Sequence, residues 1–194
     1  HKEYRRQRQM CIRDSVWPDG VGVYLVGDWP APFGIVLVVD RLAAVMLTLT
    51  AVLGLATLTY SLARWDRAGV HFHSLFQFLL MGLNGAFLTG DLFNLFVFFE
   101  VLLAASYGLL LHGSGVARVS AGLQYIAVNL VASFLLLISI ALIYGVTGTL
   151  NMADLALRAG HLTGADRMLF EAGAAILGVA CLLYTSDAAD DTPC

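Results

Sequence analysis

The sequence predicts an all-α integral membrane protein, built as a polytopic helix bundle of about four complete transmembrane helices and a truncated fifth. The first observation is composition. Of the 194 residues, 59% are hydrophobic and 13% are charged, whereas about a quarter of the residues in a soluble domain are charged. The second is the length of the apolar runs, because about 20 helical residues cross the core of a bilayer. Such runs must be helical in lipid, where no water satisfies an open backbone.

The apolar runs follow one another along most of the chain. Leu42–Leu62 carries no charged side chain, and hydroxyls are its only polar side-chain groups. A second, shorter run carries Gln77 and Asn84, and the fourth run is the most hydrophobic. A fifth run begins in the same way but meets three aspartates beyond residue 186. In sequence order the predicted spans cover residues 42–62, 72–89, 92–111, 123–144 and the incomplete 168–184.

The charges in the loops predict the orientation of these spans. If the spans alternate in direction, Arg64, Arg67 and Arg118 fall on one side of the membrane. The positive-inside rule places that side in the cytoplasm. Residues 16–40 then form an extracytoplasmic segment, and residues 41–184 form the transmembrane part.

The extracytoplasmic segment is predicted to contain a small β-hairpin. Its two candidate strands, Val21–Val26 and Gly34–Val39, are rich in β-branched residues. The stretch between them contains Pro30 and Pro32, and closely spaced prolines favour a turn.

Both ends of the chain are predicted to be extraneous sequence. Residues 1–15 are highly polar and include the string MCIRDS, and the string LLYTSDAAD leads into residues 185–194. These strings resemble translated sequencing-adapter read-through, so neither end is used in predicting the fold. The alternative is an ordinary cytoplasmic extension and tail.

Several classes of function are disfavoured by what the sequence contains. The small net charge of −3 argues against nucleic acid as a partner. Cys11, Cys181 and Cys194 form neither a CxxC pair nor a metal-ligand spacing. His71 and His73 have no evident third ligand for a metal, and no nucleophile–base constellation is present. We therefore expect no enzyme active site, no cofactor and no metal.

Glu100 is the most informative residue in the sequence. It lies near the middle of the third span, where a charged side chain costs at least about 2.5 kcal/mol. It therefore needs a partner, a water-filled cavity or a proton. A carboxyl group that gains and loses a proton as its surroundings change is what a proton relay requires, and intramembrane acids are functional by default. The structural alternative is a permanently protonated Glu100 that hydrogen-bonds a neighbouring helix.

Other polar side chains recur at helical spacing and are candidate helpers. Asn129 and Ser133 form an i, i+4 pair in the fourth span, and His73 lies four residues before Gln77 in the second. His73 sits at the proposed cytoplasmic end and is a candidate for feeding protons toward that span. The alternative for the amides and hydroxyls is that they hold neighbouring helices together. On the third span, Tyr107 shares the stripe of Glu100.

Three long strings resemble a known family of membrane proteins. They are LTGDLFNLFVFFEVLLAASYGLLLHG (residues 88–113), DWPAPFGIVLVVDRLAAVM (28–46) and YGVTGTLNMADLA (144–156). They are similar to the antiporter-type proton-pumping subunits, which include the Mrp-type multi-subunit cation/proton antiporters and the membrane arm of respiratory complex I. Within that family the strings look like the D subunit of the Mrp-type antiporters. The resemblance covers roughly residues 16–183.

The resemblance implies inverted repeats of five helices with broken helices near the membrane midplane, of which this chain would cover the third helix into the seventh. Glu100 matches the family's glutamate on the fifth helix. The family pairs that glutamate with a lysine on the seventh helix. Residues 178–183 approach the pattern around that lysine, residues 184–187 depart from it, and Lys2 is the only lysine in the chain. Without the lysine, we expect Glu100 to remain protonated and the chain alone not to transport ions vectorially.

The resulting hypothesis is a membrane subunit of a monovalent cation (Na⁺ or K⁺)/proton antiporter in a bacterial cytoplasmic membrane. It would act with other antiporter subunits in a hetero-oligomeric complex and conduct protons through Glu100, with His73, Asn129 and Ser133 as helpers. The first alternative is a proton-pumping membrane-arm subunit of an NADH–quinone oxidoreductase or a membrane-bound hydrogenase. The second is a scaffold subunit that transports nothing.

Overall fold

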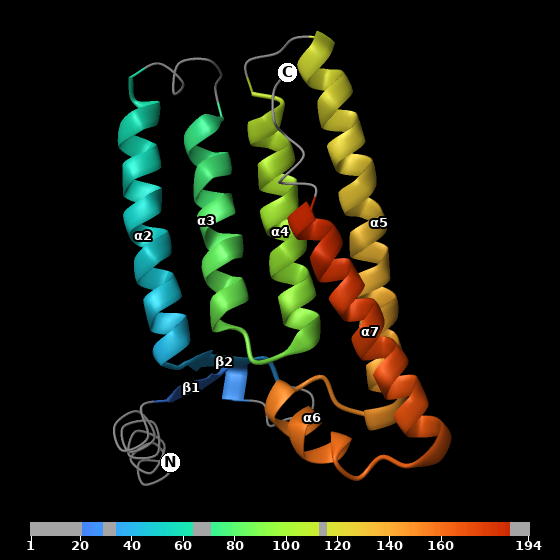
Figure 1. Cartoon of the computed structure of the whole chain (residues 1–194). Coiled ribbons are helices and arrows are strands. Elements are labelled where there is room, and N and C mark those ends of the chain that lie inside the picture. Colours follow the sequence, from blue (N-terminus) through green and yellow to red (C-terminus); the bar gives the residue numbers. More distant parts are fainter. Residues whose placement is uncertain (1–20, 29–33, 64–70, 113–115, 187–194) are drawn as a thin grey trace, which may run out of the picture.

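A computed structural model describes residues 21–28, 34–63, 71–112 and 116–186. Both chain ends that the sequence predicts to be extraneous lie largely outside these residues. Four long helices run up and down beside one another, and a fifth leans across the last two of them (Figure 1). These helices are α2 (Arg41–Ser61), α3 (Phe72–Leu88), α4 (Leu92–Leu110), α5 (Val116–Thr147) and α7 (Gly164–Ser186). The predicted all-α membrane bundle is confirmed.

The helix bounds follow the apolar runs closely. Among the described residues, three helices are long and apolar enough to cross a membrane: α2, α4 and the Gly122–Thr147 part of α5. Helix α3 has 17 residues, which is at the lower limit of a spanning helix. Most of α2 is exposed, as expected for an apolar helix that faces lipid.

The predicted β-hairpin is present and lies at one end of the bundle. Strand β1 (Gly22–Leu25) pairs antiparallel with β2 (Val36–Val39) in the register Gly22↔Val39. A single 3₁₀ turn, η1 (Val26–Asp28), follows β1, and its Gly27 has a φ of 66°, which a residue without a Cβ adopts most readily. Figure 1 shows both strands near the α3–α4 turn.

The α3–α4 turn is fastened on both sides by backbone hydrogen bonds. On the hairpin side, the Gly90 amide donates to the Val36 carbonyl at 2.8 Å. On the other side, the Leu92 amide donates to Leu150 and the Met152 amide donates to Gly90, each at 2.9 Å. Three segments that are distant in sequence therefore close one end of the bundle and fix where α4 begins.

A short helix that the sequence reasoning missed, α6 (Met152–Ala159), follows α5 at this end. Asn151 caps it, because its Oδ1 accepts from the amides of Ala153 and Asp154 at 3.1 Å. Arg158 then binds back to the end of α5, where its Nη1 donates to the Thr147 carbonyl at 2.9 Å. The 3.0 Å ion pair between Arg158 and Asp154 holds the guanidinium group in place.

The attachment of α6 is expected to weaken in acid. Hydrogen bonds from Arg158 and then Thr149 hold the pKa of Asp154 below its ordinary value of 3.8. A carboxyl group whose pKa is lowered by folding contributes its full stabilisation when the pH is above the ordinary pKa. That stabilisation is lost as the pH falls through the lowered pKa. At neutral pH, Asp154→Asn should raise amide exchange in α6 roughly twofold, since the pair is partly exposed. In the wild-type chain, amide exchange in α6 should rise only below pH 3.8, where Asp154 begins to take up a proton. Asp166→Asn is the control, and at neutral pH it should leave amide exchange in α6 unchanged.

The best-packed region lies where α4, α5, α6 and α7 meet. One buried cluster contains Leu92, Leu136, Ile140, Ile143, Leu155 and Ala180. Within it, the fully buried Ser139 donates a 2.7 Å hydrogen bond to the Gly173 carbonyl of α7. This packing fixes α7 along α5. Helix α7 ends at Ser186, two residues beyond the expected end of the fifth apolar run.

Candidate functional site

Glu100 lies at the middle of α4, half-buried and far from both ends of that helix. The start of α4 is defined by Asp91, whose Oδ1 accepts from the Asn94 amide at 2.9 Å. The Asn94 side chain in turn donates to Thr89 Oγ1 at 2.9 Å. Glu100 is eight residues from the first residue of α4 and ten from the last, so a membrane crossed by this helix would hold the carboxyl group near its midplane.

The carboxyl group of Glu100 has a partner on the neighbouring helix. Ser133 of α5 donates a hydrogen bond from its Oγ to Glu100 Oε1. Ser133 itself is buried, with 7% of its surface exposed. The sequence identified both residues as candidates but did not pair them. A hydrogen bond to one carboxyl oxygen leaves the other available to bind or release a proton.

The polar stripe of α5 continues from Ser133 toward the opposite end of the bundle from the hairpin. Asn129 lies one helical turn before Ser133 and is 1% exposed, and Tyr125 lies one turn before Asn129. The Tyr125 ring meets the Tyr107 ring of α4 edge to face, with their centroids 5.6 Å apart. Glu100, Tyr107, Tyr125, Asn129 and Ser133 therefore line one contact between α4 and α5, which we call the α4–α5 seam.

Sequence reasoning missed Tyr125 as a member of this seam. The signal was present, because Tyr125, Asn129 and Ser133 recur at i, i+4 and i+8, which places them on one face of a helix. The predicted stripe of Glu100 and Tyr107 on α4 is the face that meets them. What the sequence alone did not provide was the register between the two helices.

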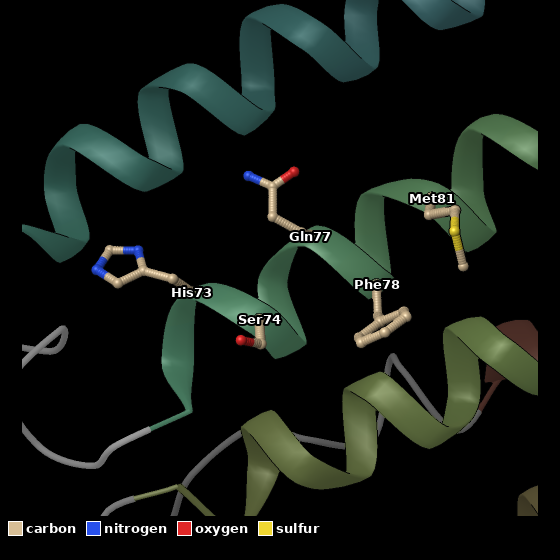
Figure 2. A pocket seen from close by; sticks show the side chains of 5 residues that line it. All are labelled: His73, Ser74, Gln77, Phe78 and Met81. Atoms are coloured by element: carbon tan, nitrogen blue, oxygen red, sulfur yellow. The ribbon is translucent and has the colours of Figure 1, made fainter.

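His73 lies elsewhere, on the exposed side of α3. It lines an open groove of about 420 Å³ together with Ser74, Gln77, Phe78 and Met81. Figure 2 shows these side chains along one stretch of α3, with Gln77 pointing toward α2. His73 and Gln77 thus share a groove, as their spacing predicts.

The structure does not bring His73 and Glu100 together. Helix α3 packs on α4 through Gly82 and Gly85, which meet Leu102 and Phe98. Phe98 and Leu102 are each two residues from Glu100, about 200° around an α-helix. Helix α3 therefore contacts the side of α4 opposite to Glu100, and the role of His73 as a helper stays a prediction.

Within the described part of the chain, no group of three or more His, Cys, Asp or Glu side chains is placed to hold a metal ion. The seam contains one carboxyl group, hydroxyls and an amide. These groups bind, donate and accept protons or water. Their chemistry suits proton handling inside an apolar bundle.

An intramembrane carboxyl group hydrogen-bonded across a polytopic bundle is typical of membrane proteins that transport ions. The transmembrane family described as NADH:quinone oxidoreductase/Mrp antiporter matches residues 89–185, which is half of the chain and includes the whole seam. The chain belongs to this family.

Individual relatives point to one branch of the family. The chain is 70% identical over 164 residues to the D subunit of a probable K⁺/H⁺ antiporter of Rhizobium meliloti, covering 84% of this chain and 30% of the relative. It is 47% identical over 150 residues to the D subunit of an Na⁺/H⁺ antiporter of Alkalihalophilus pseudofirmus, covering 76% of this chain and 30% of that relative. The chain thus spans about 30% of the length of the curated relatives it matches.

Two solved structures share the fold. The Mrp complex from Dietzia sp. DQ12-45-1b aligns with a TM-score of 0.73 at 38% identity, over 88% of this chain and 32% of the matched chain. A membrane-bound sulfane sulfur reductase, described as an archaeal respiratory membrane complex, aligns with a TM-score of 0.67 at 32% identity, over 79% of this chain and 31% of the other. The sequence-based assignment to the D subunits of Mrp-type antiporters is confirmed.

Proposed function

We propose that this chain is the proton-conducting part of a monovalent cation/proton antiporter subunit, and that Glu100 carries the proton. The observation that carries the proposal is the hydrogen bond from Ser133 to Glu100, in the middle of an apolar helix bundle. The antiporter names of the two bacterial relatives support exchange of Na⁺ or K⁺ for protons. Other antiporter subunits in a bacterial cytoplasmic membrane are the proposed partners, since one solved relative is a chain of an Mrp complex.

The mechanism follows from the cost of a charge in lipid. A bare carboxylate at this depth costs at least about 2.5 kcal/mol, so a charged carboxyl group needs a cation or hydrogen-bond donors beside it. Ser133 supplies one donor and fixes the position of the carboxyl group. When a cation approaches, the carboxylate is stabilised and a proton leaves. When the cation departs, a proton returns.

The test uses everted membrane vesicles that contain the complete complex with its full-length D subunit. Respiration first acidifies the vesicle interior, and a pH-sensitive dye reports the gradient. Addition of NaCl or KCl should release the gradient as protons leave in exchange for the cation. A complex that leaves the gradient unchanged with either salt would contradict the antiporter proposal.

A redox-driven subunit is the second candidate, favoured by the likeness to the archaeal respiratory complex. Such a complex would acidify the vesicles when its own electron donor is added and would not respond to Na⁺ or K⁺. The same vesicles therefore separate the two candidates. Higher identity to the antiporter relatives supports the first.

A further inference from the structure

Asn129 is a buried polar residue whose side-chain amide has an unsatisfied hydrogen-bond donor. It is 1% exposed, and its Nδ2 has no hydrogen-bond partner among the described residues. A buried donor without a partner costs about 1–3 kcal/mol, and buried water molecules in proteins bind to such otherwise unsatisfied groups. The amide therefore marks a place where a ligand with a lone pair would be stabilised.

The surroundings of Asn129 indicate which ligand that is. Along α4, the position between Glu100 and Tyr107 is filled by Ala104, whose methyl group offers no polar atom and is exposed. Along α5, Ser133 lies one helical turn after Asn129, and its hydroxyl donates a hydrogen bond to Glu100. The Ser133 oxygen keeps lone pairs that accept a further hydrogen bond. A water molecule accepts from Asn129 Nδ2 and donates to the Ser133 oxygen.

We propose that the α4–α5 seam is a proton-entry branch to Glu100, in which Asn129 holds one water molecule. This inference rests on the proposed function, because it assigns a route to the proton that Glu100 carries. The branch starts at the Tyr107–Tyr125 pair. This pair lies near the end of the bundle that the positions of Arg64, Arg67 and Arg118 in the sequence predict to be cytoplasmic. Glu100 lies seven residues from Tyr107, about 10 Å along the helix axis, and in the proposed branch one water and the Ser133 hydroxyl connect the two.

The proton transfer balances at each group. The Tyr125 hydroxyl gives its proton to the water and takes another from solvent at its end of the bundle, and the water passes one of its own protons to the Ser133 oxygen. Ser133 at the same time gives its own hydroxyl proton to the Glu100 carboxylate. Water and serine end neutral, and Glu100 gains one proton. Asn129 exchanges no proton and acts as a positioning residue.

The rival explanation is that Asn129 only holds α4 and α5 together. Asn129→Leu separates the two, because leucine has the same branched outline as asparagine but no donor. Asn84 on α3 provides a matched control, since its Oδ1 is also buried without a partner among the described residues. Asn84 belongs to the helix that packs on the opposite side of α4 from Glu100.

The measurement is the rate at which the Glu100 carboxyl group exchanges its proton for a deuteron, followed by infrared spectroscopy after transfer into D₂O. The complete complex is reconstituted in lipid, and the Glu100→Gln complex identifies the band of the protonated carboxyl group. We expect Asn129→Leu to slow the exchange tenfold or more and Tyr125→Phe to slow it severalfold. We expect Asn84→Leu to leave the rate unchanged.

An unchanged rate in Asn129→Leu overturns the proposal, as does an equal slowing in Asn84→Leu. If the Asn129→Leu complex does not assemble, Tyr125→Phe decides, because it keeps the ring contact with Tyr107 and removes only a hydroxyl. An unchanged rate there also overturns the entry branch. Loss of antiport in Glu100→Gln together with an unchanged rate in Asn129→Leu removes this branch alone, whereas full antiport in Glu100→Gln removes the proposed function.

Discussion

Replacing Glu100 by glutamine is expected to abolish cation/proton exchange while leaving the subunit folded and assembled. Glutamine keeps an oxygen at the position that accepts the hydrogen bond from Ser133, so the contact between α4 and α5 survives. It can neither bind nor release a proton in the physiological range. The exchange rate in everted vesicles should fall to background, and the amount of complex extracted from the membrane should match wild type.

The matched control is the same substitution at Glu171. This residue lies in α7, with 62% of its side chain exposed, and pairs with Arg167 at 2.9 Å. Exposed pairs of this kind contribute little to stability, so Glu171→Gln should leave the exchange rate unchanged. Glu100→Asp should retain part of the activity, because it keeps the carboxyl group but moves it away from Ser133. Wild-type exchange by Glu100→Gln would make the subunit a scaffold.

The bounds of the helices were largely predictable because the hydropathy signal along the chain is strong. A long apolar run in a membrane forms an α-helix, because a helix satisfies all of its backbone hydrogen bonds internally. The bounds of α2, α3 and α4 accordingly lie within one residue of the predicted runs. The hairpin was also predictable, because its strands are rich in β-branched residues. Helix α6 was missed because its eight residues are too short for a clear apolar period. Its start depends on the Asn151 cap and on contacts with the α3–α4 turn.

The candidate site was predictable residue by residue but not as a contact. Burial cost alone identified Glu100, and helical spacing identified Asn129 and Ser133. The partnership of Glu100 with Ser133 depends on how far α4 is shifted along α5, which no local pattern encodes. The backbone bonds of the α3–α4 turn set that shift by fixing where α4 begins. For the same reason, the sequence could not show that α3 presents His73 on a different side of α4.

Gly82→Val is expected to lower the stability of the folded chain. A Cβ atom at Gly82 would lie 2.8 Å from the Leu102 backbone nitrogen and 2.9 Å from its Cα. Backbone atoms cannot rotate away as a side chain can, so α3 and α4 must separate. Small residues are what allow helices in a membrane to approach this closely. Overpacking of this kind costs about 1–3 kcal/mol, which should appear as a lower melting temperature of the chain in detergent micelles.

Gly145→Val is the matched control, because a Cβ atom at Gly145 would have no neighbour within 4 Å. Valine also suits a helix interior better than glycine, so this variant should melt at or above the wild-type temperature. The two variants separate helix packing from helix propensity, since both replace a glycine within a long helix by the same side chain. If Gly82→Val has the same melting temperature as wild type, the close approach of α3 to α4 is absent in the folded protein.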